Sequence, residues 1–111
     1  MDREILKGSV DILFLVLLTK KDMYGYEMAH LLDLNSNSLY RMSEGTLYGA
    51  LRRLETRGLI SSYVPDSKGS IKRYYHITSN GRKELEHKLT NWELLCDLIR
   101  KSHEWSKSVE R

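Results

Sequence analysis

A capped helix followed at once by two β-prone runs is the pattern that most limits the folds open to this chain. Ser43 is a favoured N-cap residue, and Gly58 stands where a left-handed residue ends a helix. Residues 59–64 and 71–77 are rich in β-branched and aromatic side chains, and the turn-forming segment 65–69 lies between them. The sequence therefore predicts a helix with a β-hairpin directly behind it.

Two more helices are predicted ahead of this unit. The apolar run at 12–18 indicates that a helix over about residues 4–19 is buried nearly all round. Residues 24–34 carry an apolar stripe at helical spacing, and we expect Asp22 to cap that helix. A turn-forming cluster at 35–38 separates it from the capped helix.

A long helix is predicted after the hairpin, capped by Thr78 or Ser79. Helix–helix–helix–hairpin–helix is the order of a winged helix-turn-helix with an added C-terminal helix. The predicted class is therefore mainly α with a small β-hairpin. We expect one compact unit, with the winged helix-turn-helix in residues 1–78 and the C-terminal helix in 79–111. At 111 residues such a domain is marginally stable alone, and oligomerisation is the usual support.

Positive charge is concentrated in the helix–hairpin unit. Residues 43–83 hold eight Lys or Arg against three acidic residues, a net charge of +5, whereas the rest of the chain carries −2. Neutralising phosphates releases condensed counterions, so this charge is typical of a surface that binds a nucleic-acid backbone. The alternative is a winged-helix interaction module whose basic face binds an acidic protein partner.

The capped helix has two different faces. Leu47, Leu51 and Leu54 form its core face, while the opposite arc carries two glycines, 45 and 49, and two arginines, 52 and 53. Glycines four residues apart remove side chains where a recognition helix approaches DNA most closely. Arg52 or Arg53 then reads a guanine edge or holds a phosphate. An ordinary solvated helix face is the alternative interpretation.

The hairpin offers a second contact. Side chains alternate along a strand, so Lys72 shares a face with Tyr74, and Arg73 shares the other face with Tyr75. One aromatic set is expected to pack into the core while basic side chains and Lys68 at the hairpin tip reach a groove or a backbone. The alternative is an edge strand that charge protects from aggregation.

The C-terminal helix carries a heptad seam. Apolar side chains recur there at spacings of four and three, at Leu85, Leu89, Trp92, Cys96 and Ile99, and His103 continues the spacing. Such a seam predicts a homodimer, because a monomer would leave the apolar surface in water. The first five of these residues are the predicted dimer interface. A helix that folds back on its own domain is the alternative.

Three stretches resemble the PadR family of bacterial winged-helix transcriptional regulators. They are MYGYEMAHLL at 23–32, SEGTLYGALRRLETRGLISSY at 43–63 and KRYYHITSNGRKEL at 72–85, and the opening LKGSVDILFLVLL resembles the family's first helix. The resemblance implies a homodimeric repressor that binds a palindromic DNA operator. It departs from the family pattern at Gly49, where a proline usually follows the tyrosine.

The resemblance also implies roles for individual residues. Thr46 and Tyr48 belong to the DNA-reading helix, and Lys72 and Arg73 to the wing. With the cap residue and the arginines above, the predicted DNA-binding set is Ser43, Thr46, Tyr48, Arg52, Arg53, Lys68, Lys72 and Arg73.

The short chain resembles a compact branch of the family, some members of which sense drugs or other aromatic molecules. In them a tryptophan at the place of Trp92 stacks planar ligands between the subunits. The predicted ligand-binding set is therefore Leu89, Trp92 and Cys96, with an aromatic small molecule as the effector. Simple interface packing is the alternative for Trp92, and packing of a small hydrophobe is the alternative to a redox role for Cys96.

Other kinds of chemistry find no support. The four histidines and the single cysteine make no metal-binding spacing, and no phosphate-binding loop or catalytic triad is present. We therefore expect no enzyme and no cofactor. One cysteine fits a reducing compartment, the run at 12–18 is too short to span a bilayer, and no signal peptide precedes it. A complete cytoplasmic chain is the expectation.

Overall fold

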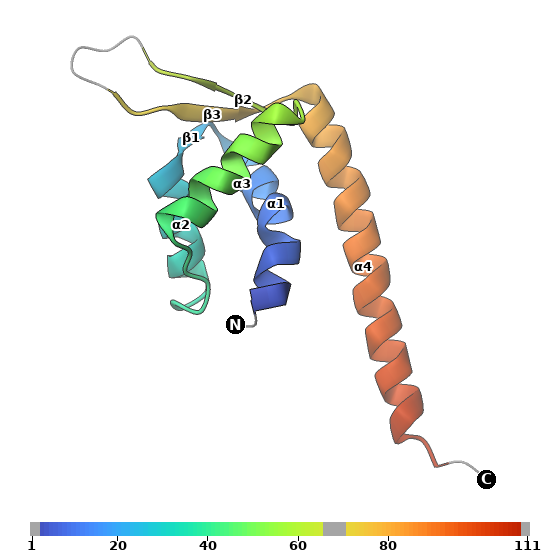
Figure 1. Ribbon diagram of the computed structural model, residues 1–111. Coiled ribbons are helices and arrows are strands. Elements are labelled where there is room, and N and C mark those ends of the chain that lie inside the picture. The colour runs from blue at the N-terminus through green and yellow to red at the C-terminus, as the bar shows by residue number, and fades with distance from the viewer. Residues whose placement is uncertain (1–2, 66–70, 110–111) are drawn as a thin grey trace.

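The computed structural model describes residues 3–65 and 71–109. In chain order its elements are α1 (Arg3–Lys20), β1 (Met23–Tyr24), α2 (Gly25–Asn35), α3 (Glu44–Thr56), β2 (Ile60–Tyr63), β3 (Tyr74–Ile77) and α4 (Ser79–Lys107). Figure 1 shows α1, α2, α3 and the sheet gathered in one body, from which α4 extends away. The molecule is therefore elongated, 72 × 30 × 21 Å. The predicted class, mainly helical with a small sheet and a long C-terminal helix, is confirmed.

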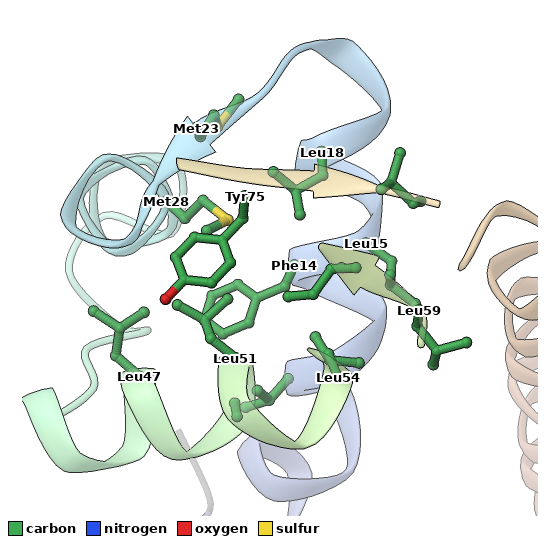
Figure 2. Packing of buried hydrophobic residues seen from close by; sticks show 14 of the residues in the cluster. Phe14, Leu15, Leu18, Met23, Met28, Leu47, Leu51, Leu54, Leu59 and Tyr75 are labelled. Carbon is green, nitrogen blue, oxygen red and sulfur yellow. The ribbon is translucent and has the colours of Figure 1, made fainter. Parts of the chain in front are cut away.

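The core forms around α1. Phe14 and Leu15 are completely buried, and Figure 2 shows them pointing toward the leucines of α3 and the sheet. Leu47, Leu51 and Leu54 of α3 are equally buried, as the helical spacing predicts. Burying side chains of this size stabilises the fold by about 1.5–3 kcal/mol each.

The ends of α3 follow the predicted signals. Ser43 is the N-cap, and its Oγ accepts a hydrogen bond from the backbone N–H of Thr46 at 3.1 Å. Gly58 adopts a φ of 74°, and the next amide, of Leu59, donates to the carbonyl of Leu54 at 3.0 Å. The chain therefore leaves α3 in a tight left-handed turn that starts β2.

The sheet has three strands rather than two. Its order is β1-β3-β2, all antiparallel, with Met23 opposite Tyr75 and Ile60 opposite Ile77. The hairpin strands are shorter than predicted, and of the predicted tip at 65–69, residues 66–69 with Lys68 lie outside the described residues. β1 was not predicted, because two residues are too short for a periodic pattern and pair only with a distant strand.

Helix α4 starts at a firm cap and then leaves the body. Thr78 is the cap residue, and its Oγ1 accepts from the amide of Gly81 at 3.0 Å. Leu85 is buried and Leu89 packs against the core, but Ile99, one heptad and a half further on, is 59% exposed. The distal part of α4 does not fold back on its own domain (Figure 1). Of the helices in the described ranges, none combines the length and apolarity needed to cross a membrane.

Asp22 does not cap α2, so that prediction was wrong. Because β1 occupies 23–24, α2 starts one residue later with Tyr24 at its N-cap and no side-chain cap. Asp22 faces the sheet instead: the hydroxyl of Tyr63 donates to its Oδ2 at 2.6 Å, and Nδ1 of His76 lies 2.8 Å from its Oδ1. It links the α1–β1 connection to the two hairpin strands.

Acid should weaken this link. The hydrogen bond from Tyr63, and then that from His76, lower the pKa of the Asp22 carboxyl. A carboxyl with a lowered folded-state pKa stabilises the fold fully above its usual pKa of about 3.9, and this contribution is lost as pH falls through the lowered value. The difference in unfolding free energy between wild type and Asp22→Asn should shrink as the pH falls below about 4.

Denaturant titrations at each pH measure this difference. In Tyr63→Phe the strongest cause of the lowered pKa is gone, so the loss should begin at a higher pH. A difference that stays the same from pH 7 to pH 2 would contradict the role given to Asp22.

Candidate nucleic-acid interface

The outward arc of α3 is open along its whole length. A Cβ added at Gly49 would meet nothing within 4 Å, and one at Gly45 would meet only Ser43 Oγ at 3.9 Å. Gly25 differs, because a Cβ there would lie 3.1 Å from the Tyr48 ring. A side chain at 25 would therefore press on the Tyr48 ring, whereas a methyl group at 45 or 49 would meet no close neighbour within the chain. The bare stretch of α3 is space that an external surface can enter.

The sequence predicted a DNA contact for either Arg52 or Arg53, and the structure shows that only one of them has an ion-pair partner within the described residues. Arg52 is exposed and makes no ion pair within residues 3–65 and 71–109. Arg53 turns the other way, and its Nη2 lies 3.5 Å from Oδ1 of Asp11 on α1. Of the two, Arg52 is the guanidinium available to an external partner beside the glycine arc.

Tyr48 lies at the edge of this arc rather than on it. Its side chain is half-buried against Gly25, and Tyr26 of α2 packs on it edge-to-face with ring centroids 6.1 Å apart. The Tyr26 hydroxyl donates to Oε1 of Glu44 at 2.7 Å, and this bond raises the pKa of Tyr26. Tyr26 and Gly25 were not among the predicted site residues, although a glycine between two tyrosines was the available signal.

Ser43 and Thr46 are occupied by the helix cap. Besides accepting from the Thr46 amide, the Ser43 hydroxyl donates to Thr46 Oγ1 at 3.0 Å. Both side chains remain exposed. They sit at the N-terminus of α3, where free amides and the helix dipole favour an anion such as a phosphate.

The wing residues fall on two sides of the sheet. Lys72 lies over the ring of Tyr24, with Nζ 4.4 Å from the ring centroid. Tyr74, in the register row between Tyr24 and Tyr63, contacts both rings, at centroid distances of 5.6 and 6.0 Å. Tyr75 is buried on the opposite face. The alternation along β3 is confirmed, and Lys72 belongs to the outer, aromatic face.

Arg73 connects the wing to α3. Its Nη1 donates to Oγ of Ser62 at 3.0 Å, and the Ser62 hydroxyl donates in turn to Oε2 of Glu55 at 2.5 Å. Arg73 is itself exposed. This chain of hydrogen bonds fixes the base of the hairpin relative to the outward arc, so a partner would meet both surfaces together.

A second exposed surface runs along α4. Trp92 is 38% exposed, and Leu98, Ile99 and Trp105 are more exposed still. Cys96 is also exposed. It lines a shallow hollow together with Thr90, Glu93, Leu94, Asp97 and Arg100. All six residues belong to α4, so a single helix lines the hollow.

Metal chemistry has no site in the described part of the chain. Among residues 3–65 and 71–109, no group of three or more His, Cys, Asp or Glu side chains could hold a metal ion.

Comparison with known proteins gives the family. Residues 14–87 match the transcriptional regulator PadR-like family. A transcriptional regulator from Clostridium thermocellum is 37% identical with a TM-score of 0.85, over 91% of this chain and 96% of that chain. A PadR family transcription regulator from Clostridium difficile is 38% identical with a TM-score of 0.73, over 85% and 97%.

A more distant structure is that of Bacillus subtilis PadR in complex with operator DNA. It shares the fold at 22% identity and a TM-score of 0.64, over 72% of this chain and 46% of that chain. The family consists of transcription regulators and not of enzymes, which confirms the expectation of no catalytic activity. The winged-helix order, the open α3 arc and these matches agree, and the chain belongs to the PadR-like family of transcriptional regulators.

Proposed function

We propose that the protein is a cytoplasmic, homodimeric repressor that binds a palindromic DNA operator through α3 and the wing. The open arc of α3 carries this proposal, because two glycines that the chain's own packing does not require lie beside the exposed Arg52. The outward arc of α3 enters the major groove, where Arg52 contacts a guanine edge. The N-terminal cap of α3 and the wing contact the phosphate backbone of the DNA.

Electrostatics supports DNA as the partner. The helix–hairpin unit carries the positive charge of the chain, and Bacillus subtilis PadR, which shares the fold, has been solved with operator DNA. Arg53 and Lys72 keep internal partners at Asp11 and Tyr24, so they act at the margin of the interface. The basic face could also bind an acidic protein partner. If it did so instead of binding DNA, this chain would show no preference among duplex sequences.

The surface of α4 supports the homodimer. Its apolar side chains continue for several turns beyond the last contact with the body and remain exposed in one chain. A contiguous apolar surface of this kind marks an interface. Two chains related by a two-fold axis would cover it with equal surfaces, and the same axis would set the spacing of the two α3 helices.

The effector site is proposed at this interface. The indole of Trp92 is exposed next to Cys96, and Leu89 lies one turn before it. Two symmetry-related indoles offer stacking faces to a planar aromatic molecule. Glu93 lines the neighbouring hollow, in which Asp97 is already paired with Arg100 and Lys101, so a cationic aromatic ligand would be favoured by Glu93. Such a ligand would release the operator by favouring one separation of the α4 helices.

Substitutions on α3 and in the wing test how the protein binds its operator. Arg52→Ala should weaken binding to the operator selected by wild type by about 1–3 kcal/mol and relax preference at one base pair. Arg53→Ala should cost less, because its guanidinium already has a partner on α1. Lys72→Ala should weaken all sequences alike and flatten the salt dependence. Fluorescence anisotropy over a salt series measures all three.

Gly49→Ala is the matched control for folding. Alanine raises helix propensity by about 1 kcal/mol, so the free protein should become more stable. The same methyl group should lower operator affinity because it fills the open arc. Unchanged affinity in both Gly49→Ala and Arg52→Ala would remove α3 from the interface.

Ile99→Asp tests the dimer. A charge at the exposed seam of α4 should convert the dimer to a monomer or an aggregate, because a carboxylate cannot be buried there unpaired. Leu34→Asp, at an equally exposed leucine on α2, should leave the mass unchanged. Analytical ultracentrifugation gives both masses. A wild-type mass equal to one chain would reject the dimer.

Trp92→Ala tests the effector site. Titration with planar aromatic cations should quench tryptophan fluorescence in wild type and lower operator affinity. The Trp92→Ala protein should lose both responses, whereas Trp105→Ala should keep them. If Trp92→Ala keeps the full response, Trp92 is a packing residue only.

A further inference from the structure

Charged side chains connect three helices where α4 begins. Arg53 Nη2 lies 3.5 Å from Oδ1 of Asp11, and Arg57 Nη1 lies 3.7 Å from Oδ2 of the same carboxylate. The other arm of Arg57, Nη2, lies 3.9 Å from Oε1 of Glu84. Lys88 completes the set with Nζ 3.7 Å from the same Glu84 oxygen. These five residues, the α1–α3–α4 ion-pair network, join Asp11 of α1 to Arg53 of α3, to the α3 C-cap residue Arg57, and to two residues of α4.

Asp11 is the centre of this network. Its side chain is 24% exposed, and its Oδ1 is buried with no hydrogen-bond partner among the described residues. It lies next to the apolar run of α1, whose side chains pack into the core. A carboxylate in such a place is costly without opposite charge, so the two guanidiniums have little freedom to leave.

The helix ends favour the same arrangement. Arg53 and Arg57 lie at the C-terminus of α3, where the helix dipole stabilises cations. The first turn of α4 is also fixed to the end of α3. Thr78 Oγ1 donates to the carbonyl of Gly58 at 2.7 Å, and a Cβ at Gly81 would overlap the Leu59 carbonyl oxygen.

The start of α4 therefore acts as a pivot close to the end of the recognition helix. Packing holds α4 from Gly81 to Leu89, mainly against α1, and the network adds charged contacts along these same turns. Glu84 and Lys88, one and two turns beyond the pivot, are the charged residues of α4 in the network. Glu84 pairs with Arg57, which in turn pairs with Asp11, so the tilt of α4 and the position of α3 depend on each other.

We propose that Asp11 is a positioning residue that, through Arg57 and Glu84, couples the tilt of α4 to the placement of α3. This rests on the proposed function: in the dimer, the coupling sets the distance between the two recognition helices and so the half-site spacing that the protein accepts. Asp11 touches no DNA in this mechanism. It acts by holding Arg53 and Arg57 against α1.

The experiment measures the preference of the protein for one spacing between operator half-sites. If Asp11 only stabilised the fold, its substitution would not change this preference. Duplexes selected by wild type from a random pool define the preferred spacing, and matched duplexes lengthened or shortened by one base pair report the preference. Asp11→Asn and Glu84→Gln should each reduce the preference about two- to thirtyfold, the range found for residues within a coupling network. The double variant should lose no more than the larger single loss, because both act through one network.

Asp33→Asn is the matched control. It removes an Asp–Arg pair of similar exposure, 3.2 Å from Arg41, that lies outside the network. It should keep the wild-type preference. Glu84 is one-third exposed, so Glu84→Gln tests the inference even if Asp11→Asn lowers stability. An unchanged spacing preference in folded Asp11→Asn and Glu84→Gln would overturn the proposal.

A distance measurement separates this inference from the proposed function. Spin labels on Thr56→Cys and Ser102→Cys, in a Cys96→Ser background diluted with unlabelled protein, report the distance from α3 to α4 within one chain. The distribution should be narrow in wild type and Asp33→Asn, and clearly broader in Asp11→Asn. If wild type selects no DNA, the proposed function fails while these distances still decide the coupling. Equal widths in all variants would overturn it.

Discussion

Burial of α1 is the interaction on which the rest of the structure depends. Phe14 and Leu15 are completely buried between α3 and the sheet, and α3 packs in addition on α2 and β2. Because α1 fixes which side of α3 points inward, it also fixes which side points outward (Figure 2). The open glycine arc is thus a consequence of the core, since the leucines of α3 and the arc lie on opposite sides of one helix.

Internal partners divide the basic residues into two groups. Asp11 binds Arg53 and Arg57, the Tyr24 ring holds Lys72, and Ser62 holds Arg73, while Arg52 stays exposed. Net charge attracts a polyanion from a distance, but residues with internal partners contribute less to reading it. The proposed specificity therefore concentrates on few side chains, and the others set their position.

Helix α4 connects the proposed DNA-binding surface to the proposed dimer interface. Its first turns belong to the body, through Leu85 and the pairs of Glu84, and its later turns present exposed apolar side chains. One helix thus has one end beside α3 and the other at the proposed dimer interface. A rigid helix of this kind can transmit a change in the separation of the two α4 helices to the two α3 helices without changing its own structure.

The sequence by itself determined the local features and the family. The cap at Ser43, the turn at Gly58 and the heptad spacing depend on neighbours within a few residues, and the structure has the first two as predicted. Tertiary structure decided between Arg52 and Arg53, created β1 and moved Asp22 from a cap to the sheet. Each of these depends on a partner far along the chain, such as Asp11 for Arg53 or Tyr63 for Asp22. Local patterns carry no information on such partners, because only folding brings them within reach.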